Sequence, residues 1–258
     1  MADGLTVLAG LRLAVAFLTV IPVPPTSEIT RPVARTAMLL GWFAVLPVAL
    51  AAAVAGWAAL LLGLPAVLAG AIVVGALALG TRAMHLDGLA DTVDGLGSGP
   101  DREKALRIMR SGDVGPMGVV ALVLVVLAQA VGFGAILERG GGWLLVVGLI
   151  AASRAALALG CAAGVPAARP DGLGALFASV VPVGWVVAVW VTVAAALSGL
   201  CWATGLPWWQ GAVAAAAALA GCAVLLRRCV HRFGGSSGDV LGALVETALT
   251  LLVVASAW

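Results

Sequence analysis

Residues 117–137 read MGVVALVLVVLAQAVGFGAIL, a run of 21 residues that contains no charged side chain. A helix needs about 20 apolar residues to cross the hydrocarbon core of a bilayer, so this run predicts a membrane span. The rest of the chain has the same character, because 63% of its 258 residues are hydrophobic and 10% are charged. A soluble domain carries about 25% charged residues, and the composition excludes that class of protein.

Six further apolar segments, each bounded by glycine, proline or charge, are long enough to cross a bilayer. The seven predicted spans are 38–61, 65–83, 117–137, 143–163, 180–200, 207–226 and 239–257. The N-terminal segment has no basic region before its apolar run, so we expect an amphipathic or re-entrant helix carrying Arg12 and no cleaved signal peptide. The sequence thus predicts an all-α, polytopic integral membrane protein with about seven transmembrane helices, in a single membrane-embedded catalytic domain spanning residues 1–258.

The basic residues predict the orientation of these spans. Three tight turns, at residues 63–65, 140–142 and 205–207, belong on one side of the membrane, together with most tryptophans. Twelve of the fourteen Lys and Arg residues then lie on the other side, which the positive-inside rule identifies as cytoplasmic. Because these charges serve topology, the net charge of +2 gives no reason to expect a nucleic-acid partner.

The chemistry is concentrated in one predicted cytoplasmic loop, residues 82–118, which holds six of the twelve acidic residues. At about 100° per residue, Asp87, Asp91 and Asp94 fall on one face of a helix. Three carboxylates on one face repel each other unless a cation lies between them, and Mg²⁺ suits oxygen ligands that share it with a phosphate. The alternative is a solvated acidic loop that only assists topology. His85 is a candidate base or ligand, or else a hydrogen-bonded structural residue.

Cations accompany the acidic motif. A short helix is expected after Ser98, where a serine followed three residues later by an acid resembles a capping box. Candidate phosphate contacts are Arg102, Lys104, Arg107 and Arg110, and the glycine-rich entry to the next span brings Asp113 toward the acidic cluster. The alternative is a basic loop that contacts only lipid headgroups.

Two charged features within the predicted spans are costly in a bilayer. Arg154 lies near the middle of 143–163 and is therefore expected to turn into the bundle toward an acid or a phosphate. Near the C-terminus, a glycine-serine loop ending in Ser237 precedes a helix whose N-terminus suits anions, and Asp239 and Glu246 share one face of that helix. A purely structural ion pair is the alternative for these groups.

The string HLDGLADTVDG at 85–95, followed by RIMR at 107–110 and by Gly115-x-x-Gly118-Val, resembles the signature of the cobalamin synthase family, the adenosylcobinamide-GDP ribazoletransferases. Weaker matches are FLTVIPVP at 17–24, Ser153-Arg154 and GSSGDVLGA at 235–243. The chain departs from the family where Ser111 stands in place of an acid, with Asp113 displaced, and where Ser237 replaces a usual threonine.

The resemblance implies that α-ribazole, or its 5′-phosphate, attacks adenosylcobinamide-GDP with release of GMP, the late nucleotide-loop step of cobalamin biosynthesis. It implies Mg²⁺ as the cofactor, held by Asp87, Asp91 and Asp94, with one of these or His85 as the base and Arg154 beside the reacting phosphate. The implied substrate-binding residues are Arg82, Arg107, Arg110, Asp113, Ser237, Asp239 and Glu246. It also implies a bacterial cytoplasmic (inner) membrane enzyme with its active site facing the cytoplasm, and it leaves the oligomeric state open.

Two other interpretations remain. A membrane prenyltransferase or CDP-alcohol phosphotransferase also pairs aspartates four residues apart around Mg²⁺, but it carries a second aspartate-rich pair, for which this chain offers only Asp239 and Glu246. A transporter would explain Arg154 and Glu246 inside the membrane. Transporters, however, place their charged site near the midplane between repeated halves, and the chain shows no such repeat.

Overall fold

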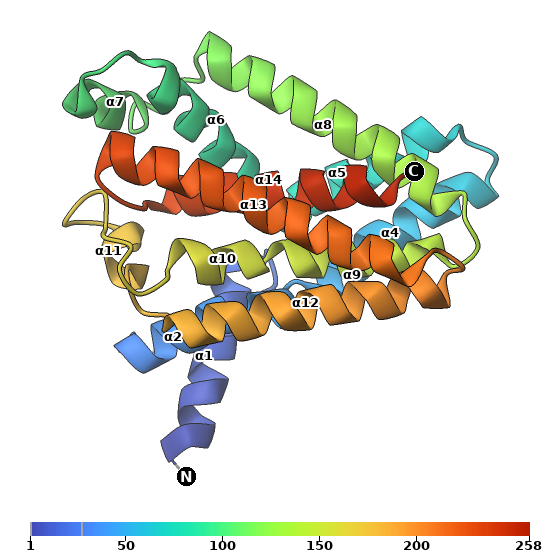
Figure 1. Ribbon diagram of the computed structural model, residues 1–258, viewed down its shortest axis with the longest axis horizontal. Coiled ribbons are helices and arrows are strands. Elements are labelled where there is room, and N and C mark those ends of the chain that lie inside the picture. Colours follow the sequence, from blue (N-terminus) through green and yellow to red (C-terminus); the bar gives the residue numbers. More distant parts are fainter. Residues whose placement is uncertain (1, 27) are drawn as a thin grey trace.

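The computed structural model describes residues 2–26 and 28–258, and this part of the chain is helical apart from its loops and two isolated β-bridges (Figure 1). The helices are α1 (Ala2–Leu18), α2 (Arg31–Leu39), α3 (Gly41–Ala44), α4 (Leu46–Leu61), α5 (Ala66–Gly80), α6 (Met84–Gly97), α7 (Arg102–Ile108), α8 (Pro116–Leu137), α9 (Gly142–Ser153), α10 (Ala155–Gly160), α11 (Leu173–Phe177), α12 (Val183–Ala203), α13 (Trp208–Phe233) and α14 (Gly238–Ser256). The prediction of an all-α fold is confirmed.

Among these residues, five helices are long and apolar enough to cross a membrane. They are Pro116–Leu137, Gly142–Gly160, Val183–Ala203, Trp208–Phe233 and Gly238–Ser256. The bent pair α5 and α6 makes a sixth if both helices belong to one crossing. The prediction of a polytopic membrane protein is therefore confirmed.

Of the seven expected spans, five are single long helices, a sixth is part of the bent pair, and the segment 38–61 holds the shorter apolar helix α4. The predicted span 38–61 is interrupted at Leu40 and Val45, which leaves α4 with 16 residues. The predicted span 65–83 ends at Gly80, and α6 then leaves at 92° to α5. Hydropathy is averaged over a window of residues, so the predicted span 38–61 combined helices that short breaks in the backbone separate.

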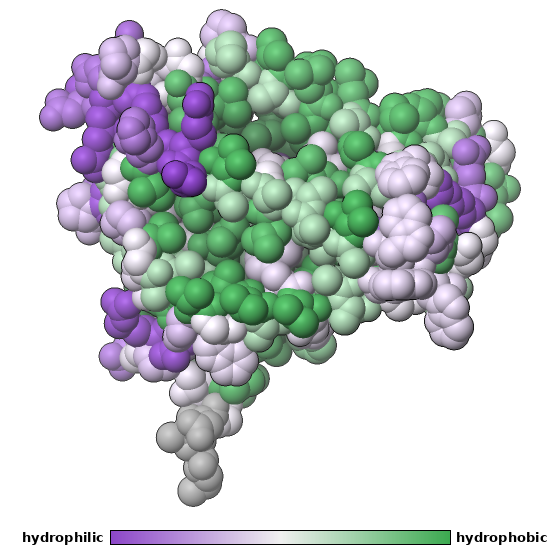
Figure 2. Space-filling view, in the orientation of Figure 1, coloured by the Kyte–Doolittle hydropathy of each residue, from purple (hydrophilic) through white to green (hydrophobic). Residues whose placement is uncertain are grey.

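The long helices run side by side, and their loops gather at two ends (Figure 1). We call the end that carries α7, α11 and the loop before α14 the polar end, because hydrophilic residues collect there while the middle of the bundle is hydrophobic (Figure 2). At the other end the rings of Trp209 and Trp258 lie 5.9 Å apart, and Trp202 and Trp208 are exposed. This pattern matches an apolar belt with tryptophan at one interface.

Helix α7 forms at the polar end as expected, but it begins later than Ser98. Asp101 is its N-cap and accepts a hydrogen bond from the Lys104 backbone N–H at 3.1 Å, a bond that lowers the pKa of the Asp101 carboxyl. Ser98 instead donates to the carbonyl oxygen of Gly95 at 2.8 Å, which closes the last turn of α6. Gly99, with a φ of 86°, and Pro100 turn the backbone between Ser98 and α7, so the later acid takes the cap.

Small residues let the membrane helices touch backbone to backbone. A methyl group at Gly70 of α5 would lie 1.9 Å from the carbonyl oxygen of Ala130 in α8, and one at Gly134 would lie 2.3 Å from the carbonyl oxygen of Ala66. Lipid supplies no hydrophobic drive for helix association, so this close packing is what holds α5 against α8.

Gly70→Ala should therefore lower the free energy of unfolding by roughly 2 kcal/mol, because the new methyl group forces two backbones apart. Thermal unfolding of the detergent-solubilised protein measures the change. Gly75→Ala is the matched control on the same helix, since a methyl group there meets nothing within 4 Å. Equal melting temperatures for the two variants would contradict the proposed close contact.

Candidate active site

The acidic motif reaches its place through a sharp turn at the polar end of α5. Arg82 and Ala83 both adopt left-handed backbone conformations, with φ of 57° and 52°, and α6 starts directly after them. Helix α6 then crosses the first turn of α14 so closely that a methyl group at Gly88 would lie 2.7 Å from the carbonyl oxygen of Asp239. The motif in the middle of the chain thus meets the glycine-serine loop near its end.

The three motif carboxylates do not face one common point. Asp94 is buried, and its two oxygens accept the backbone N–H groups of Gly115 at 2.7 Å and Gly118 at 2.9 Å, so it caps the start of α8. Asp87 is exposed and Asp91 is buried, and Asp91 lies in the electrostatic field of Asp87, Asp239 and Asp94. Asp94 is also an electrostatic neighbour of Asp91, while the incoming backbone of α8 donates one N–H to each of its oxygens. Its role as a metal ligand stays a prediction.

Consistent with this, no group of three or more His, Cys, Asp or Glu side chains within residues 2–26 and 28–258 is arranged as a ready metal site. The electrostatic neighbours of Asp91 are the other two motif aspartates, Asp87 and Asp94, and Asp239 of α14. Asp239 follows the motif by about 150 residues in the sequence.

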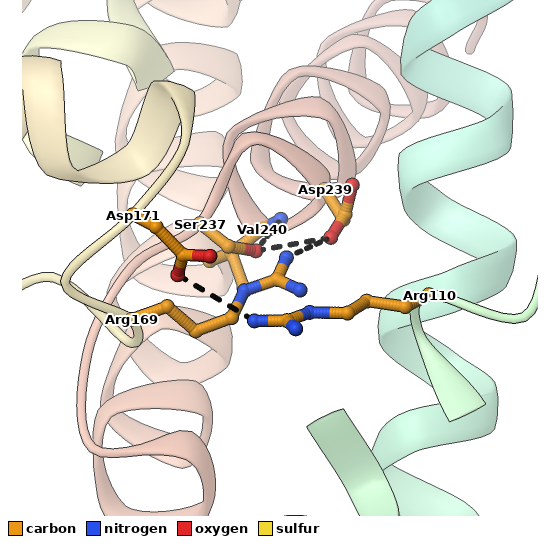
Figure 3. Close-up of polar contacts among 6 residues, drawn as sticks. All are labelled: Arg110, Arg169, Asp171, Ser237, Asp239 and Val240. Carbon is orange, nitrogen blue, oxygen red and sulfur yellow. Dashed lines mark hydrogen bonds and ion pairs between the residues drawn. The ribbon is translucent and has the colours of Figure 1, made fainter. Parts of the chain in front are cut away.

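A cavity of about 400 Å³ opens at the N-terminus of α14 (Figure 3). Its walls are Arg110, Arg169, Asp171, Gly172, Gly174, Ser236, Ser237, Gly238 and Asp239. Arg169 pairs with Asp239 at 3.4 Å, and Arg110 pairs with Asp171 at 3.5 Å. We call this the cationic cavity, because both arginines point into it with only carboxylates as ionic partners.

Two hydroxyl groups also face the cationic cavity. Ser237 accepts the Val240 N–H at 3.3 Å as the N-cap of α14, and its hydroxyl lies 3.3 Å from a carboxylate oxygen of Asp239. Ser236 is 3% exposed, and its hydroxyl has no hydrogen-bond partner in the described part of the chain. A polar group that is buried in a cavity wall without a partner is suited to a ligand.

The backbone of residues 166–168 holds Arg169 in position. Ser236 donates its N–H to Pro166 at 2.8 Å, and Ala168 donates its N–H back to Ser236 at 2.8 Å. A methyl group at Gly235 would lie 2.3 Å from the carbonyl oxygen of Pro166, so only glycine permits this approach. Arg169 was not among the site residues predicted from the sequence, although it begins the loop segment Arg169-Pro-Asp-Gly.

A second, smaller cavity of about 100 Å³ lies on the other side of the α14 N-terminus. Its polar lining consists of His85, Asp87 and Asp239, and its apolar lining is supplied by Phe17, Leu18, Met84, Leu157 and Leu241. We call it the acidic cavity. Gly238 and Asp239 belong to the walls of both cavities, so the first turn of α14 separates the cationic cavity from the acidic one.

Arg154 and Glu246 lie inside the bundle and line neither cavity, although Arg154 is an electrostatic neighbour of His85 in the wall of the acidic cavity. Arg154 is 1% exposed, as predicted for an arginine turned inward, and it donates to the Ile150 carbonyl at 3.1 Å and to the Ser153 hydroxyl at 2.8 Å. Glu246 is its electrostatic neighbour but accepts its hydrogen bond from Gln129 of α8 at 2.8 Å. Sequence reasoning missed Gln129, an uncharged group in the middle of an apolar span.

The remaining predicted site residues lie elsewhere. Arg82 donates to the carbonyls of Ala16 and Phe17 at the end of α1, Arg107 pairs with Glu103 at 3.9 Å on the outside of α7, and Asp113 is exposed before α8. The structure therefore brings together His85, Asp87, Asp91, Arg110, Ser237 and Asp239 from the predicted set, and adds Arg169 and Ser236.

The capping role of Asp94 yields a prediction about stability. Asp94→Ala should lower the free energy of unfolding by about 1–2 kcal/mol and open residues 110–115 to protease, because the buried N–H of Gly118 and the half-buried N–H of Gly115 lose their acceptor. Thermal unfolding and limited proteolysis measure both effects. Asp113→Ala removes an exposed acid from the same loop and should change neither. Unchanged stability of Asp94→Ala would contradict the capping role.

Comparison with known proteins shows the family of the chain. The cobalamin-5-phosphate synthase family model matches residues 10–257. An adenosylcobinamide-GDP ribazoletransferase of Nocardioides sp. is 43% identical over 244 residues, which cover 95% of this chain and 96% of that protein. The protein of the same name from Bradyrhizobium diazoefficiens is 37% identical over 265 residues, or 98% and 95% of the two chains. No solved structure matches.

The family match includes every residue of both cavities and all the helices except the first residues of α1. The chain belongs to the cobalamin-5-phosphate synthase family.

Proposed function

We propose that this chain is an adenosylcobinamide-GDP ribazoletransferase of cobalamin nucleotide-loop assembly, which joins α-ribazole or its 5′-phosphate to adenosylcobinamide-GDP and releases GMP. Family membership and the names of the relatives support this activity. One observation links this activity to particular residues: Asp239 lies in the wall that the cationic cavity and the acidic cavity share. Such a wall suits a reaction in which a diphosphate and a hydroxyl group meet.

The cationic cavity suits the diphosphate of adenosylcobinamide-GDP. Arg110 and Arg169 are held by single carboxylates at 3.5 and 3.4 Å, contacts that phosphate oxygens can replace with charge-assisted hydrogen bonds. The free N–H groups at the start of α14 add a site for negative charge, as helix N-termini do for phosphates. The unpartnered hydroxyl of Ser236 supplies a further donor.

The acidic cavity suits the attacking hydroxyl group of ribazole. As the new O–P bond forms to the cobinamide-side phosphorus, the P–O bond to GMP breaks and its electron pair leaves with GMP. The hydroxyl proton must pass to a base, and Asp87 and His85 line the cavity in which the hydroxyl would lie. Positioning both reactants against one helix terminus supplies the main rate advantage in such a phosphoryl transfer.

Mg²⁺ fits the donors that the structure collects. Asp87, Asp91 and Asp239 offer hard carboxylate oxygens, and Mg²⁺ needs only one or two of them when water and phosphate fill its other positions. Bound there, the ion would neutralise charge on the diphosphate and on the departing phosphate. Asp94 is the further predicted ligand, and each of its oxygens already accepts one backbone N–H, which leaves it less acceptor capacity than Asp87 or Asp91.

We further propose that the site faces the cytoplasm. Both cavities open at the polar end, which carries α7 and the arginine-rich end of α13. Basic loops stay on the cytoplasmic side of a bacterial inner membrane.

GMP release from adenosylcobinamide-GDP and α-ribazole tests the activity directly, with protein in liposomes and with Mg²⁺ present or chelated. We expect turnover only with Mg²⁺, and a loss of at least about 100-fold in kcat for Asp87→Asn or Asp91→Asn, because each removes charge from the acidic cluster. Glu103→Gln is the control, since Glu103 is exposed on α7 outside both cavities. Turnover of prenyl or CDP-alcohol donors by wild-type protein, without GMP release, would contradict the assignment.

A separate prediction concerns Arg169, which sequence reasoning did not select. Arg169→Gln should raise KM for adenosylcobinamide-GDP by about ten- to a hundredfold, because a charge-assisted contact to phosphate contributes about 1.5–3 kcal/mol. Arg169→Lys keeps the charge and should recover part of the loss. Steady-state kinetics with each substrate varied in turn separates this effect from a change in KM for ribazole, which should stay within about twofold if Arg169 contacts only the diphosphate.

A further inference from the structure

A third cavity, of about 630 Å³, lies against the polar half of α13 and shares no lining residue with the cationic or the acidic cavity. Its lining consists of Leu96, Val224, Arg227, Arg228, His231 and Arg232. Val224, Arg227, Arg228 and His231 follow the spacing i, i+3, i+4 and i+7, so they occupy one face of the helix. The cavity therefore combines an apolar lip with a row of basic groups.

The length of α13 places this row at a particular depth. Arg227 follows Trp208 by 19 residues, which corresponds to about 29 Å at a rise of about 1.5 Å per residue. The hydrocarbon core of a bilayer is about 30 Å thick, and tryptophan favours the interface. With the exposed Trp208 at one interface, Arg227 and Arg228 lie at the level of the lipid headgroups on the other.

The basic groups of this cavity differ in their contacts. Arg232 donates to the carbonyls of Pro100 and Asp101 at 3.0 Å each, so it is part of the wall. Arg227, Arg228 and His231 are exposed, and none of them has a hydrogen bond or an ion pair with any residue that the structure describes. Next to them Val224 is 65% exposed on the apolar side. Uncompensated cations thus border a surface that faces acyl chains.

We propose that this cavity binds an anionic phospholipid of the bilayer, with the headgroup phosphate at Arg227 and Arg228 and an acyl chain along Val224 and Leu96. The basic side chains match a negative headgroup, and the apolar lip beside them matches a lipid better than a soluble anion. Topology alone requires basic residues on this side, but it does not require a cavity whose lining changes from apolar to basic along one helix face. The inference does not depend on the proposed enzymatic activity.

Native mass spectrometry of the detergent-solubilised chain tests the proposal, with titrations of phosphatidylglycerol, of phosphatidylcholine with the same acyl chains, and of inorganic phosphate. Each arginine near an anionic headgroup contributes about fivefold in affinity, so Arg227→Gln/Arg228→Gln should weaken the first phosphatidylglycerol by about 25-fold. Phosphatidylcholine binding should stay unchanged. The charge-conserving Arg227→Lys/Arg228→Lys should keep most of the affinity, which also shows that the site tolerates substitution without unfolding.

Arg12→Gln/Lys104→Gln is the matched control, because it removes two charges from exposed positions outside the cavity. We expect this variant to bind phosphatidylglycerol as the wild type does. An equal loss in both double variants would overturn the proposal in favour of diffuse surface charge. Displacement of phosphatidylglycerol by inorganic phosphate at similar concentration would overturn it in favour of a soluble-anion site.

Discussion

The close crossing of α6 over the first turn of α14 is the contact on which the candidate site depends. Gly88 has no side chain, and this allows the backbone of Asp239 to approach until only a hydrogen atom fits between the two helices. One side of the crossing carries Asp87 and Asp91, and the other carries the free N–H groups of a helix N-terminus. A carboxylate cluster and an anion site thus become neighbours, although about 150 residues separate them in the chain.

The bilayer explains why the polar groups are distributed as they are. Charged side chains collect at one end of the bundle, and those within it are buried against other helices, as Arg154 and Glu246 are. Several arginines also satisfy carbonyls that helix ends leave open: Arg82 at the end of α1 and Arg139 at the end of α14, where it donates to Ser256 and Ala257 at 2.8 Å. In a setting with little water, the same residue type serves topology, capping and ligand binding.

The three cavities at or near the polar end differ in the side chains that line them. The cationic and acidic cavities share the first turn of α14, which suits a reaction between two substrates that meet at a phosphate. The cavity on α13 has its own arginines at headgroup depth and an apolar lip. We propose that these two arginine pairs bind different ligands because their neighbours differ: carboxylates and hydroxyls in one case, aliphatic side chains in the other.

The sequence by itself determined the membrane class, the helical fold and most of the polar side chains of the site, because hydropathy, charge and motif spacing are local properties. It also indicated that Arg154 turns inward, since an exposed charge in lipid is costly. Only the tertiary structure decided which groups meet: Asp94 caps α8, Arg169 joins Asp239, and breaks at Leu40 and Val45 shorten the first predicted span. These outcomes depend on which backbone arrives beside each side chain, and no local pattern contains that information.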